Sequence, residues 1–452
     1  TSGVPIVLLL YSEVNSDLVL SFIFKIVLLA FLLYIILRID RANIANVFVF
    51  VFFYLFFIIA PILQMGSDES NTLVNTLPVR IEQIFFANIL TTIFLSVYIL
   101  SYLIFCRSSL QPFIRETVKN QEIVHRLVLA AMIFISFIAV MFAVREIRER
   151  VSIIEMINSS IDEDSSSASF LRTKVLFNIP LATYIYYVTV VRKRGEFLLL
   201  FLVFVFVLIT KNPILEKRNA VGATYMLLLY IHFGKHIKNN RQLFSLIFGM
   251  FIVLFPLSSL LTHRGVLYWK NLTFKSAEKA LSNHFVELHY DAWANVAATI
   301  DYVAMKGHTF GSQLLGVFFF YIPRGIWKGK PFPSGLTIGD HLINKYNMWF
   351  NNLSAPVQAE AYLDFGIPGV IVYAIFVGFA VAKLGQLKND RVGLERYAAV
   401  FVSISAMFIL RGPLMPSIAY TTGAVASILL VPKFLTYLFS LVNWNVRIKR
   451  VL

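Results

Sequence analysis

The chain carries many apolar stretches that are long enough to cross a lipid bilayer. A membrane-crossing helix needs about 20 apolar residues, and about eleven stretches approach that length: 18–37, 44–64, 83–106, 126–144, 175–191, 197–210, 219–233, 243–262, 367–386, 397–411 and 417–438. Only 14% of the residues are charged, whereas soluble domains carry roughly 25%. The sequence therefore predicts an all-α fold, a polytopic transmembrane helical bundle of about 11 spans.

The distribution of Lys and Arg orients these spans. Alternate loops hold 17 of them, including the runs RKR at 192–194 and RIKR at 447–450. The other set of loops holds 18, spread over almost three times as many residues. Because cytoplasmic loops are the ones enriched in Lys and Arg, the first set is expected inside the cell. The net charge of +15 then reflects topology, and no nucleic-acid partner is predicted.

Three parts follow from this pattern: an N-terminal bundle of about eight spans (1–262), a large outward loop (263–366), and C-terminal spans with a basic cytoplasmic tail (367–452). The inward loops are short and contain no Gly-rich phosphate-binding motif, which disfavours an ATP-driven pump or a nucleotide-sugar enzyme. A loop as long as 263–366 exceeds what a connection needs, so function is expected there. Within it, apolar residues at helical spacing predict an amphipathic helix over 276–304 that lies on the membrane or caps the bundle.

A basic cluster follows an apolar run in the outward loop. Residues 316–322 are expected to lie at or dip into the membrane boundary, and Pro323 to end that segment. Arg324, Lys328 and Lys330 would then sit at headgroup depth, and an ordinary snorkelling anchor is the alternative interpretation.

Arginines at the mouths of other spans point to a ligand. Arg218 and Arg264 stand where an unpaired charge is costly, which makes them candidate site residues. Guanidinium groups bind phosphate oxygens through paired hydrogen bonds. A pyrophosphate at the outer face of a membrane indicates a lipid carrier.

Aromatic residues gather in the same loop, which holds four of the five tryptophans. Flat rings with a polar edge stack on sugars and are also stable at a membrane boundary. Tyr321, Trp327 and Trp293 are the candidate sugar-binding residues, and interfacial anchoring is the alternative.

Three motifs resemble the closing outer loop of bacterial O-antigen polymerases of the Wzy type. YIPRGIWKGKPFPSG supplies an aromatic-Ile-Pro stretch at Tyr321–Pro323 and a Trp-x-x-Lys-Pro turn at Trp327–Pro331; GDHLIN follows, and SAPVQAEAYLDFGIPGV supplies Glu-x-Tyr-x-x-Phe-Gly at Glu360–Gly366. Arg324 and Gly335 match an Arg-x10-Gly spacing of the family. KRNAVGATYMLLLY resembles the Gly-x-Arg entry to a helix, but the Gly is missing before Arg218.

The resemblance implies an inverting membrane glycosyltransferase of lipopolysaccharide O-antigen biosynthesis. It would transfer a growing glycan from undecaprenyl pyrophosphate to the next lipid-linked repeat unit at the periplasmic face of the inner membrane. No cofactor is implied, and a chain-length regulator protein is an expected partner, beside the membrane lipids. An O-antigen ligase, or a flippase without chemistry, is the alternative; a flippase should line its central spans with charge, and few charges lie there, notably Lys25, Lys383 and Lys433.

Catalysis of this transfer requires charge neutralisation and a base. Arg324, Arg264 and Arg218, with Lys328 and Lys330, are the predicted pyrophosphate ligands.

The candidate bases are Glu360, His341 and Asp340. Imidazole is an ordinary proton acceptor near neutral pH. Each base has a structural alternative: an ion pair of Glu360 with arginine, a structural role for His341, and a helix cap at Asp340.

A metal site is not predicted. Asp162-x-Asp164 has the spacing of a divalent-cation site, but the surrounding serines and acids are typical of a solvated loop. One cysteine, Cys106, excludes an internal disulfide and a Cys-cluster metal site.

Overall fold

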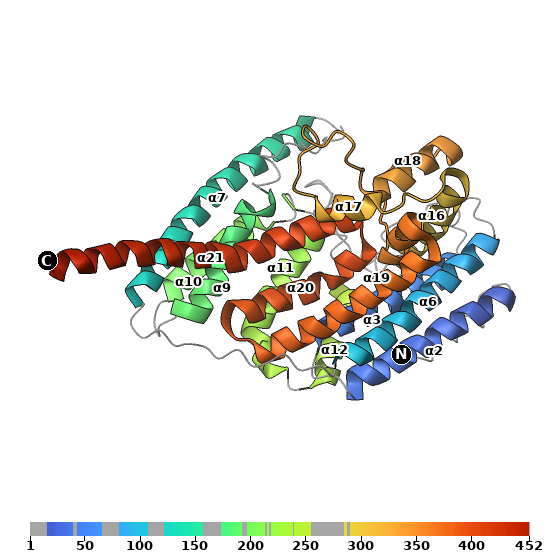
Figure 1. Cartoon of the computed structure of the whole chain (residues 1–452), viewed down its shortest axis with the longest axis horizontal. Coiled ribbons are helices and arrows are strands. Elements are labelled where there is room, and N and C mark those ends of the chain that lie inside the picture. Colours follow the sequence, from blue (N-terminus) through green and yellow to red (C-terminus); the bar gives the residue numbers. More distant parts are fainter. Residues whose placement is uncertain are drawn as a thin grey trace. The chain divides into compact units, whose positions relative to one another are not determined.

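The computed structural model describes residues 16–38, 43–65, 81–106, 122–156, 173–191, 197–212, 215–216, 218–237, 239–254, 284–286 and 290–451. All regular structure in these ranges is helical, which confirms the all-α prediction (Figure 1). Seven helices are long and apolar enough to cross a membrane: Leu18–Arg38, Ile44–Met65, Glu82–Cys106, Glu122–Glu149, Val357–Asp390, Gly393–Arg411 and Leu414–Leu441.

The four other predicted spans correspond to shorter helical segments. They are η2–α9–η3 (Leu176–Asn178, Ile179–Tyr186 and Tyr187–Val191), α10 (Phe197–Thr210), α11 (Arg218–Phe233) and α12–η5 (Asn240–Gly249 and Met250–Leu254). The end of the last predicted span, 255–262, lies outside the described residues. Length and composition therefore support seven spans within the described part of the chain, and the predicted number of about eleven is not confirmed.

The chain divides into two compact units. Unit 1 comprises Thr1–Ser109, Lys235–Gly385 and Ala406–Ile418, and unit 2 comprises Leu110–Gly234, Gln386–Ser405 and Ala419–Leu452.

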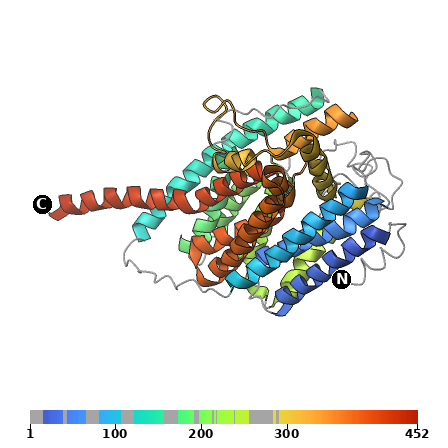
Figure 2. The ribbon, with the colours of Figure 1, turned by 45° about the vertical axis from the view of Figure 1, so that its right-hand side comes forward.

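Unit 1 is built around a deeply buried span. This span consists of α3 (Ile44–Tyr54), the π-helical turn η1 (Leu55–Ile59) and α4 (Ala60–Met65). Of the residues in its apolar 18-residue stretch, 94% are buried. The helices α2 (Ser16–Arg38) and α6 (Ile81–Cys106) lie side by side in both ribbon views, coloured dark and light blue (Figure 2).

A buried lysine joins these three spans. Lys25 of α2 donates to the carbonyl oxygen of Phe57 in η1 at 2.9 Å and to Oδ1 of Asn88 in α6 at 2.7 Å. Its ammonium also lies 3.9 Å from the centre of the Phe22 ring. A charge inside a span is costly, and here hydrogen bonds to neutral oxygens offset part of that cost.

The predicted amphipathic helix is described in part, because residues 276–283 and 287–289 lie outside the described residues. The rest of 276–304 contains the short η6 (His284–Val286) and α16 (Ala292–Lys306), which begins after Asp291 and is followed by Gly307. Gly307 has φ 80°, a conformation that favours glycine. Since α16 packs against α6 and η1, the described residues favour a helix that caps the bundle.

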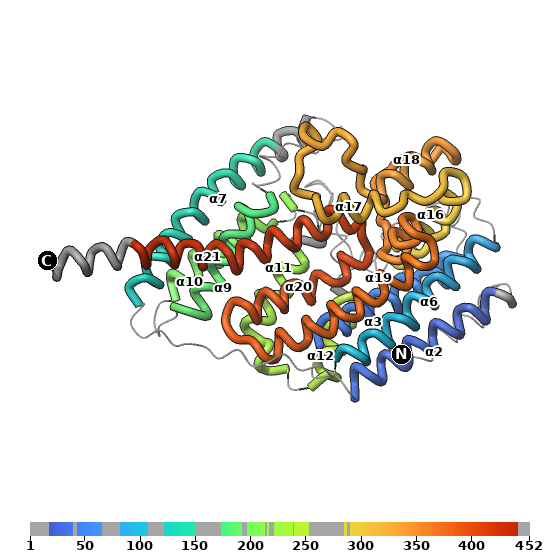
Figure 3. The backbone as a smooth tube through the Cα atoms, viewed as in Figure 1, coloured from blue at the N-terminus to red at the C-terminus, as the bar shows by residue number. Residues whose placement is uncertain are grey.

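The segment predicted to end at Pro323 ends earlier. The helix α17 (Ser312–Phe318) stops at Phe318, and turns follow it. The backbone leaves the helical region at Phe319 (φ −105°, ψ 30°), so Pro323 does not terminate the helix. Figure 3 traces the chain from α17 through a long loop into α18 (Ser334–Tyr346).

A kink marks the start of the ninth predicted span. The helix α19 (Val357–Asp390) is interrupted at Gly366, where φ is 65° and ψ is −151°. Glycine reaches this positive φ without the steric cost of a Cβ. The kink separates residues 357–365 from the predicted span at 367–386.

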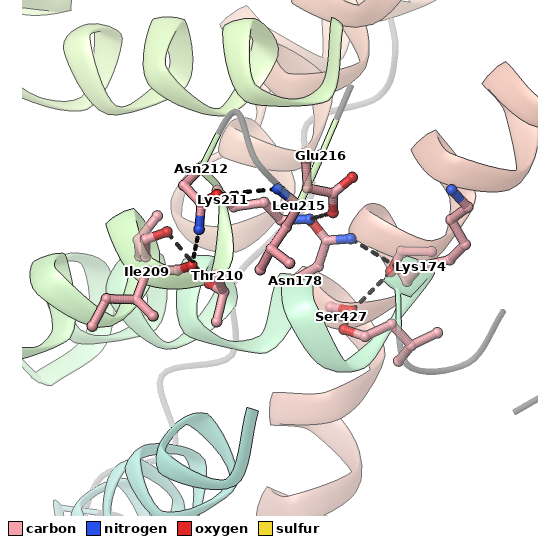
Figure 4. Close-up of polar contacts among 12 residues, drawn as sticks. Lys174, Asn178, Ile209, Thr210, Lys211, Asn212, Leu215, Glu216 and Ser427 are labelled. Carbon is pink, nitrogen blue, oxygen red and sulfur yellow. Dashed lines mark hydrogen bonds and ion pairs between the residues drawn. The ribbon is translucent and has the colours of Figure 1, made fainter. Parts of the chain in front are cut away.

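Unit 2 contains α7 (Glu122–Met156), α9, α10, α11 and most of α21 (Leu414–Val451). Figure 4 shows a polar cluster where α9 begins and α10 ends. Lys211 and Glu216 form a buried ion pair at 2.7 Å, and the Asn178 amide donates to the Lys174 carbonyl at 2.8 Å. On α21, Ser427 donates to the carbonyl of Val175 at 3.1 Å, which ties this helix to the same cluster.

Candidate active site

A buried carboxylate lies at the centre of a polar cluster in unit 1. Asp301 lies on α16 and is only 5% exposed. Its Oδ2 accepts from Nζ of Lys345 at 2.8 Å and from the hydroxyl of Tyr346 at 3.1 Å, and lies 2.9 Å from Nε2 of His341. Its Oδ1 accepts from Lys345 at 2.9 Å and from the amide of Gln83 on α6 at 3.0 Å. These five residues, Gln83, Asp301, His341, Lys345 and Tyr346, are called the Asp301 hub below.

The electrostatics of the hub favour an ionised carboxylate. Burial disfavours the charge of Asp301, but hydrogen bonds from Lys345, His341 and Gln83 outweigh burial and lower the pKa of Asp301 to about 2. Burial lowers the pKa of Lys345, yet its bonds to Asp301 and Tyr346 outweigh that effect and leave the pKa raised. At neutral pH the hub therefore contains a carboxylate and an ammonium group in direct contact.

The helix α18 brings two of these groups to one face. His341 and Lys345 are four residues apart, which places them one above the other on a helix. A close backbone approach holds α18: a Cβ on Gly339 would lie 2.1 Å from the carbonyl oxygen of Asn351. The ring of Tyr302 meets His341 edge-on, with 5.4 Å between ring centres.

Asp340 does not cap a helix, because α18 begins at Ser334 and Asp340 lies inside it. Its Oδ1 accepts from the amide of Asn351 at 2.7 Å on an exposed surface. The prediction of a cap at this residue was therefore wrong.

Glu360 lies in a separate, enclosed position. It is 2% exposed and accepts from the hydroxyl of Ser334 and from the backbone amide of Leu414 at 2.9 Å. One carboxylate thus joins the beginnings of α18, α19 and α21. Its recorded partners are a hydroxyl and an amide, and not the arginine of the structural alternative.

A second buried carboxylate was missed by the sequence reasoning. Asp291 lies immediately before α16 and accepts from Nη2 of Arg411 at 2.9 Å and from the hydroxyl of Ser354 at 2.7 Å. The Asn295 amide donates to its other oxygen at 2.9 Å.

A pattern signal was available for Asp301. It follows Trp293 and Ala297 at intervals of four residues, on the apolar side of the predicted helix. An acid at such a position is buried at a cost and requires partners.

Two of the predicted pyrophosphate ligands hold their own loop together. Arg324 donates from Nη1 to the carbonyl of Lys330 at 2.6 Å and from Nη2 to that of Pro331 at 2.9 Å. Its guanidinium lies 4.0 Å from the centre of the Phe332 ring. The ammonium of Lys330 donates to the carbonyls of Phe320 and Ile322. Burial, and then the charge of Arg324, lower the pKa of Lys330.

The other predicted ligands are distributed differently. Lys328 is exposed on the same loop. Arg218 begins α11, but its side chain is outside the described part of the structure, and Arg264 lies outside the described residues. Asp162 and Asp164 also lie outside them, and the described residues contain no cluster of three His, Cys, Asp or Glu side chains that could hold a metal ion.

Trp293 is not available to a sugar, contrary to the prediction. It is 1% exposed, and its indole nitrogen donates to Oδ1 of Asn88 at 3.0 Å. By contrast, Tyr321 is 60% exposed, and Trp327 is partly exposed beside Phe319.

Seven apolar spans and a buried hub of carboxylate, imidazole and ammonium groups define a multi-pass membrane protein with the elements of an acid–base site. Residues 2–439 match the model of the family O-antigen polysaccharide polymerase Wzy. The chain therefore belongs to this family of membrane polymerases, which act on lipid-linked oligosaccharide repeat units, and the resemblance seen in the sequence is confirmed. No curated protein and no solved structure matches the chain.

Proposed function

We propose that this chain transfers a growing O-antigen glycan from undecaprenyl pyrophosphate to the next lipid-linked repeat unit, at the periplasmic face of the inner membrane. One observation carries the proposal: Oδ2 of Asp301 contacts both the imidazole of His341 and the ammonium of Lys345. The reaction needs a proton acceptor for the attacking hydroxyl and a cation near the departing pyrophosphate. The Asp301 hub supplies both groups on one helix face.

In this mechanism His341 is the general base and Asp301 is its positioning residue. An Nε2–H of His341 that donates to Asp301 leaves the lone pair on Nδ1 to accept the hydroxyl proton. The hydroxyl oxygen forms a bond to the anomeric carbon as the bond from that carbon to the pyrophosphate oxygen breaks. The bonding electrons leave with the pyrophosphate. A single displacement of this kind inverts the anomeric configuration and needs no nucleotide or redox cofactor.

The charge that develops on the pyrophosphate requires cations. Lys345 is the first candidate because its side chain is 29% exposed and lies beside the base. Lys328, Arg218 and Arg264 remain predicted ligands.

Other predicted site residues are given a supporting role. Arg324 and Lys330 donate hydrogen bonds to main-chain carbonyls, so we assign them the role of holding the loop that precedes α18 in its shape. Glu360 is assigned the role of joining the beginnings of α18, α19 and α21 through its hydrogen bonds. Tyr321 and Trp327 are the proposed sugar-stacking residues, because their rings remain accessible.

Reconstitution distinguishes the polymerase from its alternatives. The purified protein, placed in proteoliposomes with only the lipid-linked repeat unit, is expected to produce a ladder of lengthening lipid-linked glycans. A ligase would leave this substrate unchanged until lipid A core is added, and a flippase would move it without forming glycosidic bonds. Either of these outcomes would contradict the proposal. The proposed partner, a chain-length regulator, should change the length distribution when it is added.

The periplasmic orientation has its own test. A reporter tag inserted within 305–312 should indicate the outside of the membrane. Tags within 110–120 and after Leu452 should indicate the cytoplasm. A cytoplasmic signal from 305–312 would refute the proposed location of the site.

A further inference from the structure

Large apolar side chains are exposed along residues 310–332, outside the helices that qualify as spans. Four of them are well exposed: Phe310 82%, Phe318 64%, Ile326 80% and Phe332 59%. Soluble surfaces rarely gather so much apolar area without a partner. The partner must therefore accept rings and aliphatic groups over an extended surface.

The position of α17 fixes the depth of this segment. A Cβ on Gly316 would lie 2.5 Å from Cε of Met415, near the start of α21. A Cβ on Gly311 would lie 2.7 Å from the ring of Phe365, next to the kink of α19. The helix α17 thus packs beside the start of α21 and the kink of α19, and the ends of membrane-crossing helices lie near the bilayer boundary.

Hydrogen bonds strengthen this attachment. The backbone amide of Thr309 donates to the carbonyl of Leu363 at 2.9 Å. The amide of Leu314 donates to Oδ2 of Asp364 at 2.9 Å, and the hydroxyl of Thr309 bonds the other carboxylate oxygen. Asp364 is completely buried, so the start of α17 is fixed to the part of α19 that precedes the kink.

The charge of the segment selects the kind of lipid. Residues 310–332 contain Arg324, Lys328 and Lys330 and no acid. Basic residues near a membrane surface are attracted to anionic headgroups. The bonds of Arg324 and Lys330 to carbonyls of their own loop also give it a fixed shape, so its apolar side chains are presented together.

We propose that residues 310–332 form an interfacial anchor, which inserts its exposed apolar side chains into the boundary between headgroups and acyl chains and prefers anionic phospholipids. This segment leads directly into α18, which carries His341 and Lys345. Anchoring it sets the height of the Asp301 hub relative to the membrane. The inference rests on packing and charge, and it stands whether or not the chain is a polymerase.

Depth-dependent quenching tests the anchor. Cys106→Ser removes the one natural thiol, and Ile326→Cys then carries an environment-sensitive nitrobenzoxadiazole probe in vesicles that contain doxyl-labelled lipid. Lys306→Cys, exposed at the end of α16, is the matched control, and Phe318→Cys is a second position in the anchor. Probes at 326 and 318 should show blue-shifted emission and at least twofold stronger quenching than the probe at 306.

Three results would overturn the proposal. Equal quenching at 326, 318 and 306 would show that the segment does not insert. Equal quenching in phosphatidylglycerol and phosphatidylcholine vesicles would refute the preference for anionic lipid. A blue shift that appears only after the lipid-linked repeat unit is added, without quenching by the doxyl lipid, would assign the surface to the substrate's prenyl chain instead.

Discussion

Replacement of Asp301 by asparagine removes the centre of the proposed site with little change in volume. An amide presents one oxygen and one NH2 group, so donors that now meet one of the two carboxylate oxygens would face another donor. In either amide orientation at least two of the present hydrogen bonds are lost, because each oxygen accepts two or more.

The expected effect is large. A hydrogen bond to a charged group contributes about 1.5–3 kcal/mol, so the loss of two weakens the hub by about 3 kcal/mol or more. If this free energy holds His341 in its reactive tautomer, turnover falls roughly a hundredfold, at about 1.4 kcal/mol per decade. The same loss should also lower the thermal stability of unit 1.

Activity per folded molecule separates the two effects. Polymerisation by purified variants is measured against the fraction that remains folded, taken from a thermal unfolding curve. Asp364→Asn is the matched control: Asp364 is also buried and accepts amide and hydroxyl bonds, but its hydrogen bonds join it to Thr309, Gln313 and Leu314 and not to the hub. This control should lose stability and keep near-normal turnover per folded molecule. If Asp301→Asn also turns over normally, its carboxylate has only a structural role and the reasoning fails.

Four other outcomes are expected. The hub should persist near neutral pH and weaken only in acid, because the pKa of Asp301 is lowered to about 2. The stabilisation that the ionised carboxylate contributes is present above its ordinary pKa near 4 and is lost as the pH falls toward 2. Hydrogen exchange of α18 would detect this loss. Asp162→Ala combined with Asp164→Ala should leave polymerisation largely intact with or without EDTA; a loss restored by Mg²⁺ or Mn²⁺ would show a metal site. Trp293→Phe should cost about 1 kcal/mol of stability, from one lost hydrogen bond, but little turnover per folded molecule; selective loss of turnover would restore the sugar-binding role. Arg324→Lys should make the following loop more sensitive to protease, because one ammonium replaces a fork that bridges two carbonyls; unchanged resistance would contradict that role.

Much of the fold could be predicted because apolar length is a local property of the sequence. The all-helical bundle and the helix of residues 197–210 follow from uninterrupted apolar residues. The kink at Gly366 lies beside the predicted start of a span at residue 367, but the apolar helix that qualifies as a span runs from Val357 to Asp390. The number of spans was harder, because several apolar runs form helices too short to qualify.

The candidate site was only partly predictable. His341 was selected for its chemistry, but its partner Asp301 lies 40 residues earlier, and no local pattern specifies that pairing. Arg324 shows the opposite limitation: its charge and position matched a phosphate ligand, whereas tertiary structure engages its donors with nearby carbonyls. Residue type predicts what a side chain is able to bind, and only packing determines which groups it meets.

The most direct test of the proposed chemistry is the pH–rate profile of polymerisation by His341→Gln beside the wild type. Glutamine retains an amide donor for Asp301 but has no imidazole to accept a proton. General-base catalysis contributes about 10²–10⁴ in rate, so the variant should be slower by at least about a hundredfold, at normal abundance and stability. Its profile should also lose the fall in rate toward low pH that protonation of a base produces. A ladder formed at the wild-type rate, with the wild-type profile, would contradict the assignment of His341 as the base.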